Sequence, residues 1–315
     1  MIHLQQLTKQ FGGKTVVDEL DFIVRPGIVT GFLGPNGAGK STTMRMIVGL
    51  DRPTSGSVTV DGKSYADLPA PLNEVGALLE ARSVHTGRSA YNHLRVLAAT
   101  HGIGRSRVLD LIEMVGLADV AGQRAGAFSL GMGQRLGIAA TLLGDPGTLI
   151  LDEPVNGLDP DGILWIRNLL KELATEGRTV LISSHLMSEM ALTAEHLIVI
   201  GKGKLIADTP IADMITAASR ASVLVRSPET QRLQSLLTGP DVSVSESGPD
   251  LLEVTGLAAP QIGDLAAAHG IAIHELTPQR ASLEEAFMKL TNDAIEFHGG
   301  TTAEMTGITG QRVAA

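Results

Sequence analysis

The sequence is poor in several residue types. Its 315 residues include no cysteine, which excludes disulfides and thiolate metal sites and is typical of a reducing compartment. Aromatic residues make up only 3% of the chain, so its core must consist mainly of Leu, Val, Ile and Ala. Apolar residues still amount to 43%, which is enough for a sizeable core, and the length suggests about two domains.

Long apolar runs and an excess of positive charge are also missing. No segment approaches the roughly 20 continuous apolar residues that span a bilayer, and residues 1–6 lack the basic and apolar regions of a secretory signal. The net charge of −9 argues against a nucleic-acid partner, because binding to phosphate backbones needs a basic face. We therefore expect a cytoplasmic protein, either soluble or peripheral.

A glycine-rich loop near the N-terminus matches the phosphate-binding pattern G-x-x-x-x-G-K-[ST]. It reads Gly34-Pro35-Asn36-Gly37-Ala38-Gly39-Lys40-Ser41-Thr42. Apolar residues 28–33 predict a strand before it and residues 42–48 a helix after it, so phosphates would meet the N–H groups and dipole of a helix N-terminus. Lys40 places an ammonium beside the β- and γ-phosphates, and the Ser41 hydroxyl can ligate Mg²⁺. The loop therefore predicts binding of a nucleoside triphosphate; an ordinary glycine-rich turn is the alternative.

The apolar pattern predicts an α/β domain over residues 1–215. Helical spacing from about 84 to 145 predicts a helical insertion. The remaining segments favour strands, and the apolar runs at 148–151 and 179–182 suit parallel strands that are covered on both faces. Predicted strands lie at 14–18, 20–24, 57–62, 148–151, 179–182, 197–200 and 204–206.

A smaller α+β domain is predicted over residues 216–295. Its pattern is β-α-β-β-α-β followed by a capped helix that begins at Ser282. The strands are expected at 222–225, 242–244, 251–254 and 271–273, and the helices at 228–237 and 259–269. Residues 296–315 are rich in Gly and Thr, and we expect them to be disordered.

Two acids end the apolar strand at 148–151. A carboxylate at the carboxyl end of a strand lies where ligands bind in open α/β sheets. Asp152 can hold Mg²⁺, and Glu153 can polarise a water aimed at the γ-phosphate. A solvated strand end is the simpler alternative, but the phosphate loop favours the catalytic interpretation.

Two further segments offer polar groups to the same phosphates. Ser129 and Gly131 open a helix, which makes either an anion site or a plain helix cap. His185 follows the strand at 179–182, where its imidazole can donate a hydrogen bond to the γ-phosphate. A lone histidine is otherwise more often a satisfied surface or core residue.

Taken together, these segments resemble the ATP-binding subunit of an ATP-binding cassette (ABC) transporter over residues 1–215. The resemblance implies a P-loop NTPase cassette of α/β class, with a mixed sheet core, an antiparallel β subdomain and a helical subdomain. It identifies residues 129–134 as the signature loop, Asn156-Gly157-Leu158-Asp159 as the D-loop and His185 as the switch histidine. Phe11 falls where the family stacks an aromatic ring on adenine, although a core role for this residue is the alternative.

The chain departs from the family pattern at two places. The usual signature Leu-Ser-Gly-Gly-Gln is replaced by Phe128-Ser129-Leu130-Gly131-Met132. The usual Mg²⁺-sensing glutamine is replaced by Glu80, whose carboxylate either ligates the metal or serves in coupling. These departures are similar to the daunorubicin-resistance type of exporter ATPase, as is the C-terminal run Arg280-Ala281-Ser282-Leu283-Glu284-Glu285-Ala286-Phe287.

The resemblance also implies a mechanism and partners. Two copies would close head to tail, with ATP and Mg²⁺ on the phosphate loop of one copy and Ser129, Gly131 and Met132 of the other copy over them. Asp159 would lie at the same interface, Glu153 would act as the base, and Lys40 and His185 would contact the γ-phosphate. Separate membrane permease subunits would carry a drug-like or hydrophobic cargo, which places the chain on the inner face of the cell membrane.

Two other functions fit the motifs less well. A soluble cassette ATPase acting on nucleic acid or ribosomes usually carries two cassettes or a long coiled-coil insertion, whereas this acidic chain has one phosphate loop. A regulatory module that binds but does not hydrolyse nucleotide would not need Glu153 and His185.

Overall fold

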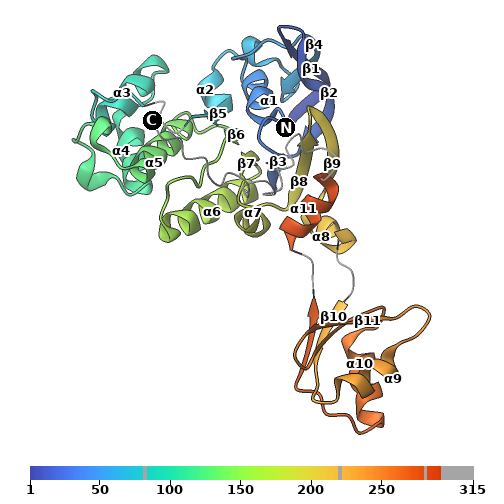
Figure 1. Ribbon diagram of the computed structural model, residues 1–315. Coiled ribbons are helices and arrows are strands. Elements are labelled where there is room, and N and C mark those ends of the chain that lie inside the picture. The colour runs from blue at the N-terminus through green and yellow to red at the C-terminus, as the bar shows by residue number, and fades with distance from the viewer. Residues whose placement is uncertain (81–83, 219–221, 280–281, 292–315) are drawn as a thin grey trace, which may run out of the picture.

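The computed structural model describes residues 1–80, 84–218, 222–279 and 282–291. A six-stranded sheet lies at its centre, in the order β5-β6-β7-β3-β8-β9 (Figure 1). Five strands are parallel and β9 pairs antiparallel with β8, so the predicted mixed sheet is confirmed. The strands are β3 (Val29–Leu33), β5 (Val75–Leu78), β6 (Thr148–Leu151), β7 (Thr179–Ser183), β8 (His196–Gly201) and β9 (Lys204–Pro210).

Both faces of this sheet are covered, which explains the continuous apolar runs of its strands. Alternate residues of each strand point to opposite faces. Ile150, Leu181 and Ile198 pack with helix α1 (Lys40–Ile47) in one core cluster. Leu151 and Ile182 pack in the other cluster, with residues of α5 (Leu130–Thr141), α6 (Pro160–Thr175) and α7 (Met187–Thr193).

A three-stranded antiparallel sheet in the order β2-β1-β4 covers the α1 side. It consists of β1 (Ile2–Phe11), β2 (Lys14–Val24) and β4 (Ser55–Val60). The two strands predicted at 14–18 and 20–24 form the single strand β2. Its pairing with β1 shifts register, and Glu19 within it has a φ of 50°. The irregularity breaks the alternation in the sequence without ending the strand.

The helical subdomain contains α3 (Ala90–Thr100) and α4 (Arg105–Met114) beside α5, with short 3₁₀ helices η2 (Ala118–Val120) and η3 (Ala125–Ala127). Leu94, Ala98, Val108 and Leu111 are all fully buried, as their helical spacing predicted. Between β4 and β5 lie η1 (Tyr65–Asp67) and the one-turn helix α2 (Pro71–Glu74).

The C-terminal domain has the predicted β-α-β-β-α-β pattern and a core cluster of its own. Its sheet order is β11-β12-β10-β13, all antiparallel. The elements are β10 (Ser222–Arg226), α9 (Thr230–Leu237), β11 (Ser243–Gly248), β12 (Leu251–Thr255), α10 (Ala259–Ala268) and β13 (Glu275–Gln279).

The predicted strand at 271–273 is wrong. Ile271 is buried in the domain core, and its N–H bonds the carbonyl of Ala266 at the end of α10. The strand begins four residues later, at Glu275, and pairs with β10 along its whole length. It is an edge strand, which explains why it tolerates Pro278.

Helix α11 (Leu283–Thr291), predicted as part of the C-terminal domain, packs elsewhere. It contacts α8 (Ile211–Ala218) and α7, and Leu283, Ala286 and Phe287 belong to the core cluster of the cassette. Figure 1 shows α8 and α11 beside each other next to β9. Residues 280–281 and the predicted tail at 296–315 lie outside the described residues. Within the described ranges, no helix combines the length and hydrophobicity needed to cross a bilayer.

Candidate nucleotide-phosphate site

The phosphate loop connects β3 to α1 and requires glycine at two positions. A β-carbon on Gly34 would lie 2.5 Å from the carbonyl oxygen of Ile200. Gly39 caps α1 with a φ of 105°, and a β-carbon there would lie 2.8 Å from the carbonyl oxygen of Val16. The loop therefore keeps its backbone close to the sheet, with the first N–H groups of α1 directed at an open pocket. This pocket is lined by Val16, Asn36, Gly37, Ala38, Gly39, Lys40, Ser41 and Thr42.

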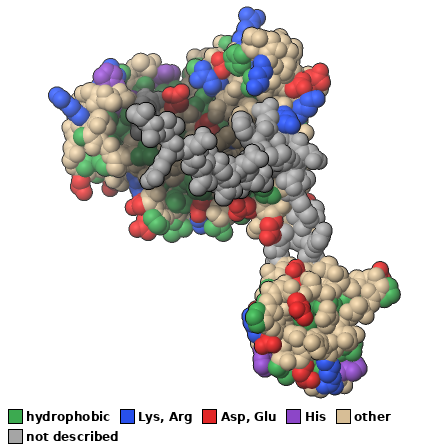
Figure 2. Space-filling view, viewed as in Figure 1, with side chains coloured by type: hydrophobic (Ala, Val, Ile, Leu, Met, Phe, Trp, Pro, Cys, Tyr) green, Lys and Arg blue, Asp and Glu red, His purple; other side chains and the backbone are tan. Residues whose placement is uncertain are grey.

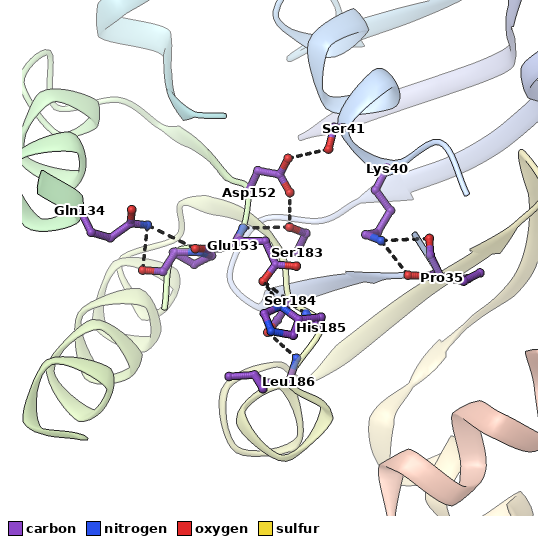
Figure 3. A network of polar contacts seen from close by, with 12 residues as sticks. Pro35, Lys40, Ser41, Gln134, Asp152, Glu153, Ser183, Ser184, His185 and Leu186 are labelled. Atoms are coloured by element: carbon purple, nitrogen blue, oxygen red, sulfur yellow. Dashed lines mark hydrogen bonds and ion pairs between the residues drawn. The ribbon is translucent and has the colours of Figure 1, made fainter. Parts of the chain in front are cut away.

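Lys40 bridges the two ends of the loop. Its ammonium donates to the carbonyl oxygens of Gly34, at 2.6 Å, and Pro35, at 3.3 Å (Figure 3). Burial lowers the pKa of Lys40, and the carboxylates of Glu153 and Asp152 oppose that shift. The cation is thus held in the loop by carbonyl groups that a phosphate can replace.

Three neighbouring strands bring oxygen ligands together. The Ser41 hydroxyl, after β3, donates to Asp152 Oδ2 at 2.7 Å, and the Ser183 hydroxyl, at the end of β7, donates to Asp152 Oδ1. A serine hydroxyl beside a carboxylate is a donor set that suits Mg²⁺. Among the described residues no group of three His, Cys, Asp or Glu side chains could hold a metal ion.

Glu153 and His185, predicted from separate segments, are in direct contact. The Glu153 Oε2 atom lies 2.7 Å from His185 Nδ1 and accepts the backbone N–H of His185 at 3.3 Å. Glu153 has a φ of 53°, a left-handed conformation that is uncommon outside glycine. Its own N–H donates to the Ser183 hydroxyl at 2.9 Å.

Gln134 is also a member of this network; the resemblance placed it at the end of the signature loop but implied no role for its side chain. The residue lies in α5 and is completely buried. Its amide Nε2 donates to the carbonyl oxygens of Glu153, at 3.3 Å, and Pro154, at 3.0 Å (Figure 3). A glutamine on the buried side of a mostly apolar helix was the available signal.

The start of α5 has contacts within its own helix and with the D-loop. The Ser129 hydroxyl accepts the N–H of Met132 at 3.2 Å, so Ser129 is the helix cap that the simpler interpretation predicted. A β-carbon on Gly131 would lie 2.6 Å from the carbonyl oxygen of Gly157. Met132 is half-buried against the core. A contact of these residues with the nucleotide stays a prediction.

Asp159 and Phe11 lie at other edges of the site. The Asp159 carboxylate caps α6 by accepting the N–H of Gly162 at 3.0 Å. Phe11 is 49% exposed, so its interpretation as a core residue is wrong. It pairs across the β1–β2 ladder with Lys14, which lines a second pocket beside the loop. The ammonium of Lys9 lies 4.7 Å from the centroid of this ring. Stacking of Phe11 on adenine stays a prediction.

Glu80 is exposed two residues beyond β5. The pKa of Arg45 on α1 is raised chiefly by its hydrogen bond to Asp51, and the Glu80 carboxylate raises it further. Glu80 therefore lies in the electrostatic field of Arg45. A role in binding Mg²⁺ stays a prediction.

The chain is similar to known proteins both in sequence and in fold. The family model described as ABC transporter matches residues 17–156, and a model of a domain of unknown function (DUF8746) matches residues 221–284. The chain is 36% identical over 299 residues to the uncharacterized ABC transporter ATP-binding protein YhcH of Bacillus subtilis, covering 94% of this chain and 97% of that protein. It is also 36% identical over 299 residues to the bacitracin transport ATP-binding protein BcrA of Bacillus licheniformis, covering 92% and 97%.

A solved cassette has the same fold. It is described as dimeric, in a post-hydrolysis state bound to ADP and phosphate. The TM-score is 0.61 at 24% identity, over 67% of this chain and 98% of that one. The part of the chain that this match covers is about the length of the α/β cassette.

Proposed function

The chain belongs to the ATP-binding proteins of ABC transporters, and from this premise we propose that it powers export of a drug-like or hydrophobic compound through separate membrane subunits. As a member of this family it binds ATP and is an ATPase whose hydrolysis drives transport. The roles are assigned from contacts beyond the carboxyl ends of the neighbouring strands β3, β6 and β7. Ser41 bonds Asp152 there, and Glu153 contacts His185.

Each of these residues has a chemical role in the proposal. Lys40 and the N–H groups of α1 bind the β- and γ-phosphates. Mg²⁺, when bound, neutralises charge that develops on the phosphates, and Ser41 and Asp152 are positioned to hold it. Glu153 accepts a proton from the attacking water, and His185, 2.7 Å from Glu153, donates a hydrogen bond to the γ-phosphate. Glu80 is proposed as a further oxygen ligand of the metal.

We propose a head-to-tail homodimer with two composite sites. Ser129, Gly131 and Met132 of one copy cover the nucleotide on the loop of the other, and Asp159 lies at the same interface. Phe11 stacks on the adenine. The helix start at Ser129 and the exposed ring of Phe11 support this arrangement, as does the dimeric state of the structural neighbour.

The cargo and location follow from the relatives. BcrA is named for bacitracin transport and aligns with both domains of this chain, which supports a hydrophobic antibiotic-like cargo. The similarity to the daunorubicin-resistance subgroup also supports a hydrophobic or drug-like cargo. The chain would lie on the inner face of the cell membrane, attached through permease subunits. The proposal includes no nucleic-acid partner, because the chain carries a net charge of −9. On the face drawn in Figure 2, acidic and basic side chains are intermingled.

The base assignment is tested by Glu153→Gln, which keeps the size of the side chain and removes its basicity. We expect ATP turnover to fall by about 100-fold or more while ATP binding persists. Trapped dimers should accumulate with ATP, measurable by size-exclusion chromatography. Normal turnover would refute the base assignment, and a variant that never dimerises with ATP would contradict the sandwich.

A further inference from the structure

The backbone of Glu153 is held in a conformation that its own residue type disfavours. Its φ of 53° brings the β-carbon of an L-residue close to the following carbonyl, so the conformation persists only where the surroundings fix it. The conformation matters because the Glu153 carboxylate contacts His185 from this backbone, at 2.7 Å. The groups that fix this backbone therefore set the position of the carboxylate.

Hydrogen bonds on both sides of the residue fix this backbone. The N–H of Glu153 donates to Ser183, on β7 in the neighbouring strand. The carbonyl oxygens of Glu153 and the following Pro154 both accept from the Gln134 amide. The Glu153 carbonyl also accepts the N–H of Asn156 at 3.2 Å, so the Pro154 carbonyl is the one that this amide bonds alone among the described groups. Pro154 has no N–H to donate, so the peptide groups at this turn depend on side chains for much of their hydrogen bonding.

Gln134 is an unusual residue for its surroundings. It is fully buried in α5, as are Leu136 and Ile138 of the same helix, and its Oε1 atom has no hydrogen-bond partner among the described atoms. Burying an unpaired amide oxygen is unfavourable. A glutamine at this position therefore lowers the stability of the fold through its unpaired oxygen. The only hydrogen bonds that its amide makes among the described groups are the two to the Glu153–Pro154 backbone.

We propose that Gln134 is a positioning residue for ATP hydrolysis: it holds the backbone of Glu153 in its left-handed conformation and so aims the carboxylate. The same helix begins at Ser129 and carries Gly131 against the D-loop. A shift of α5 would therefore reach Glu153 through one side chain. This inference rests on the proposed role of Glu153 as base.

The test compares Gln134→Met with Gln134→Asn in the full chain. Methionine keeps the volume and removes the donor, whereas asparagine keeps the amide on a shorter arm. We expect kcat to fall about 10- to 100-fold in Gln134→Met, with the KM for ATP changed less than about twofold, and an intermediate loss in Gln134→Asn. Thr141→Val is the matched control. It removes a buried hydroxyl bond in the same helix, from Thr141 to the Ile138 carbonyl at 2.7 Å, and should leave kcat unchanged.

The Glu153→Gln background separates a positioning role from a structural one. If Gln134 acts through Glu153, Gln134→Met should add little to the loss in single-turnover rate already caused by Glu153→Gln. An equal further loss in that background, a parallel rise in KM, or unchanged kcat in Gln134→Met would each overturn the inference. Substantial turnover by Glu153→Gln alone would instead refute the base assignment, so the two failures are distinguishable. If Gln134→Met does not fold, a wild-type kcat in Gln134→Asn with normal stability overturns the inference, and a reduced kcat with normal KM supports it.

Discussion

At the scale of single residues, the site depends on glycines whose backbone lies so close to a neighbouring carbonyl oxygen that no side chain would fit. Gly34, Gly39 and Gly131 each face a backbone oxygen at a distance that no β-carbon can occupy. Gly34 and Gly39 shape the phosphate loop, and the sequence pattern identified both. Gly131 was identified from the family resemblance as a nucleotide contact. The structure adds a reason within the monomer, because it lets α5 pack on the D-loop at Gly157.

Gly131→Ala tests this packing. Helix propensity alone would favour alanine by up to about 1 kcal/mol, but the β-carbon would lie 2.6 Å from the Gly157 carbonyl oxygen. We expect the free energy of unfolding to fall by about 1–3 kcal/mol, because backbone must shift to admit the methyl group. Gly122→Ala is the control, since a β-carbon there meets nothing within 4 Å. Equal free energies of unfolding of the two variants in urea denaturation would show that the contact between α5 and the D-loop admits a methyl group without loss of stability.

The residues that the sequence did and did not predict differ in how they act. Lys40, Ser41, Asp152 and Glu153 bond through side chains that are typical for their chemistry, so their types and spacing predicted them. Gln134 acts on a backbone carbonyl 19 positions away in the chain. Nothing in a single sequence indicates which backbone groups lie opposite a helix face, so the sequence placed Gln134 in the signature loop without indicating what its amide bonds.

At the scale of elements, buried strands were the most predictable part. Every residue of β6 and β7 is buried, and their central positions are apolar because helices cover both sheet faces. Strand β13 was misplaced because Ile271 and Ile273 look like a strand but pack as a loop against the domain core. The real strand contains Pro278 and is mostly polar, since it lies at the sheet edge.

Helix α3 contains a titratable group that links stability to pH. The pKa of His93 is lowered below its ordinary 6.5 by burial, and further by the nearby Arg88 and His85. The unfolded chain therefore binds more protons between the folded pKa and 6.5, and stability falls as the pH drops through that window. We expect the free energy of unfolding to fall less in His93→Leu than in the wild type between about pH 7.5 and about pH 5, since these values bracket the ordinary histidine pKa of about 6.5.

Urea denaturation at the two pH values measures this difference. His101→Leu is the control, because His101 is an exposed residue at the end of the same helix. Its pH dependence should match that of the wild type. Identical pH dependence in His93→Leu and the wild type would show that His93 does not contribute to acid sensitivity.

At the scale of the whole molecule, the C-terminal domain is an insertion between two helices of the cassette. Helix α8 leads into it, and α11 returns to pack on α8, α7 and the cassette core. The sequence predicted α11 and its cap but assigned it to the C-terminal domain. An amphipathic helix shows the same pattern whichever core it covers, so the partner of α11 could be seen only in the folded chain.

The ends of the inserted domain are neighbours, which makes it removable. Ser222 at the start of β10 lies opposite Gln279 at the end of β13. We therefore expect a chain in which residues 219–281 are replaced by a short Gly/Ser linker to keep its cassette fold and its basal ATPase, because α8 and α11 can still pack together. Thermal unfolding and ATP turnover measure both.

Phe287→Ala in the full chain is the contrasting variant. It removes a side chain that is only 7% exposed in the cassette core, and should lower the free energy of unfolding by about 3–5 kcal/mol. A deletion that unfolds the cassette, together with a harmless Phe287→Ala, would show that α11 is held by the inserted domain instead.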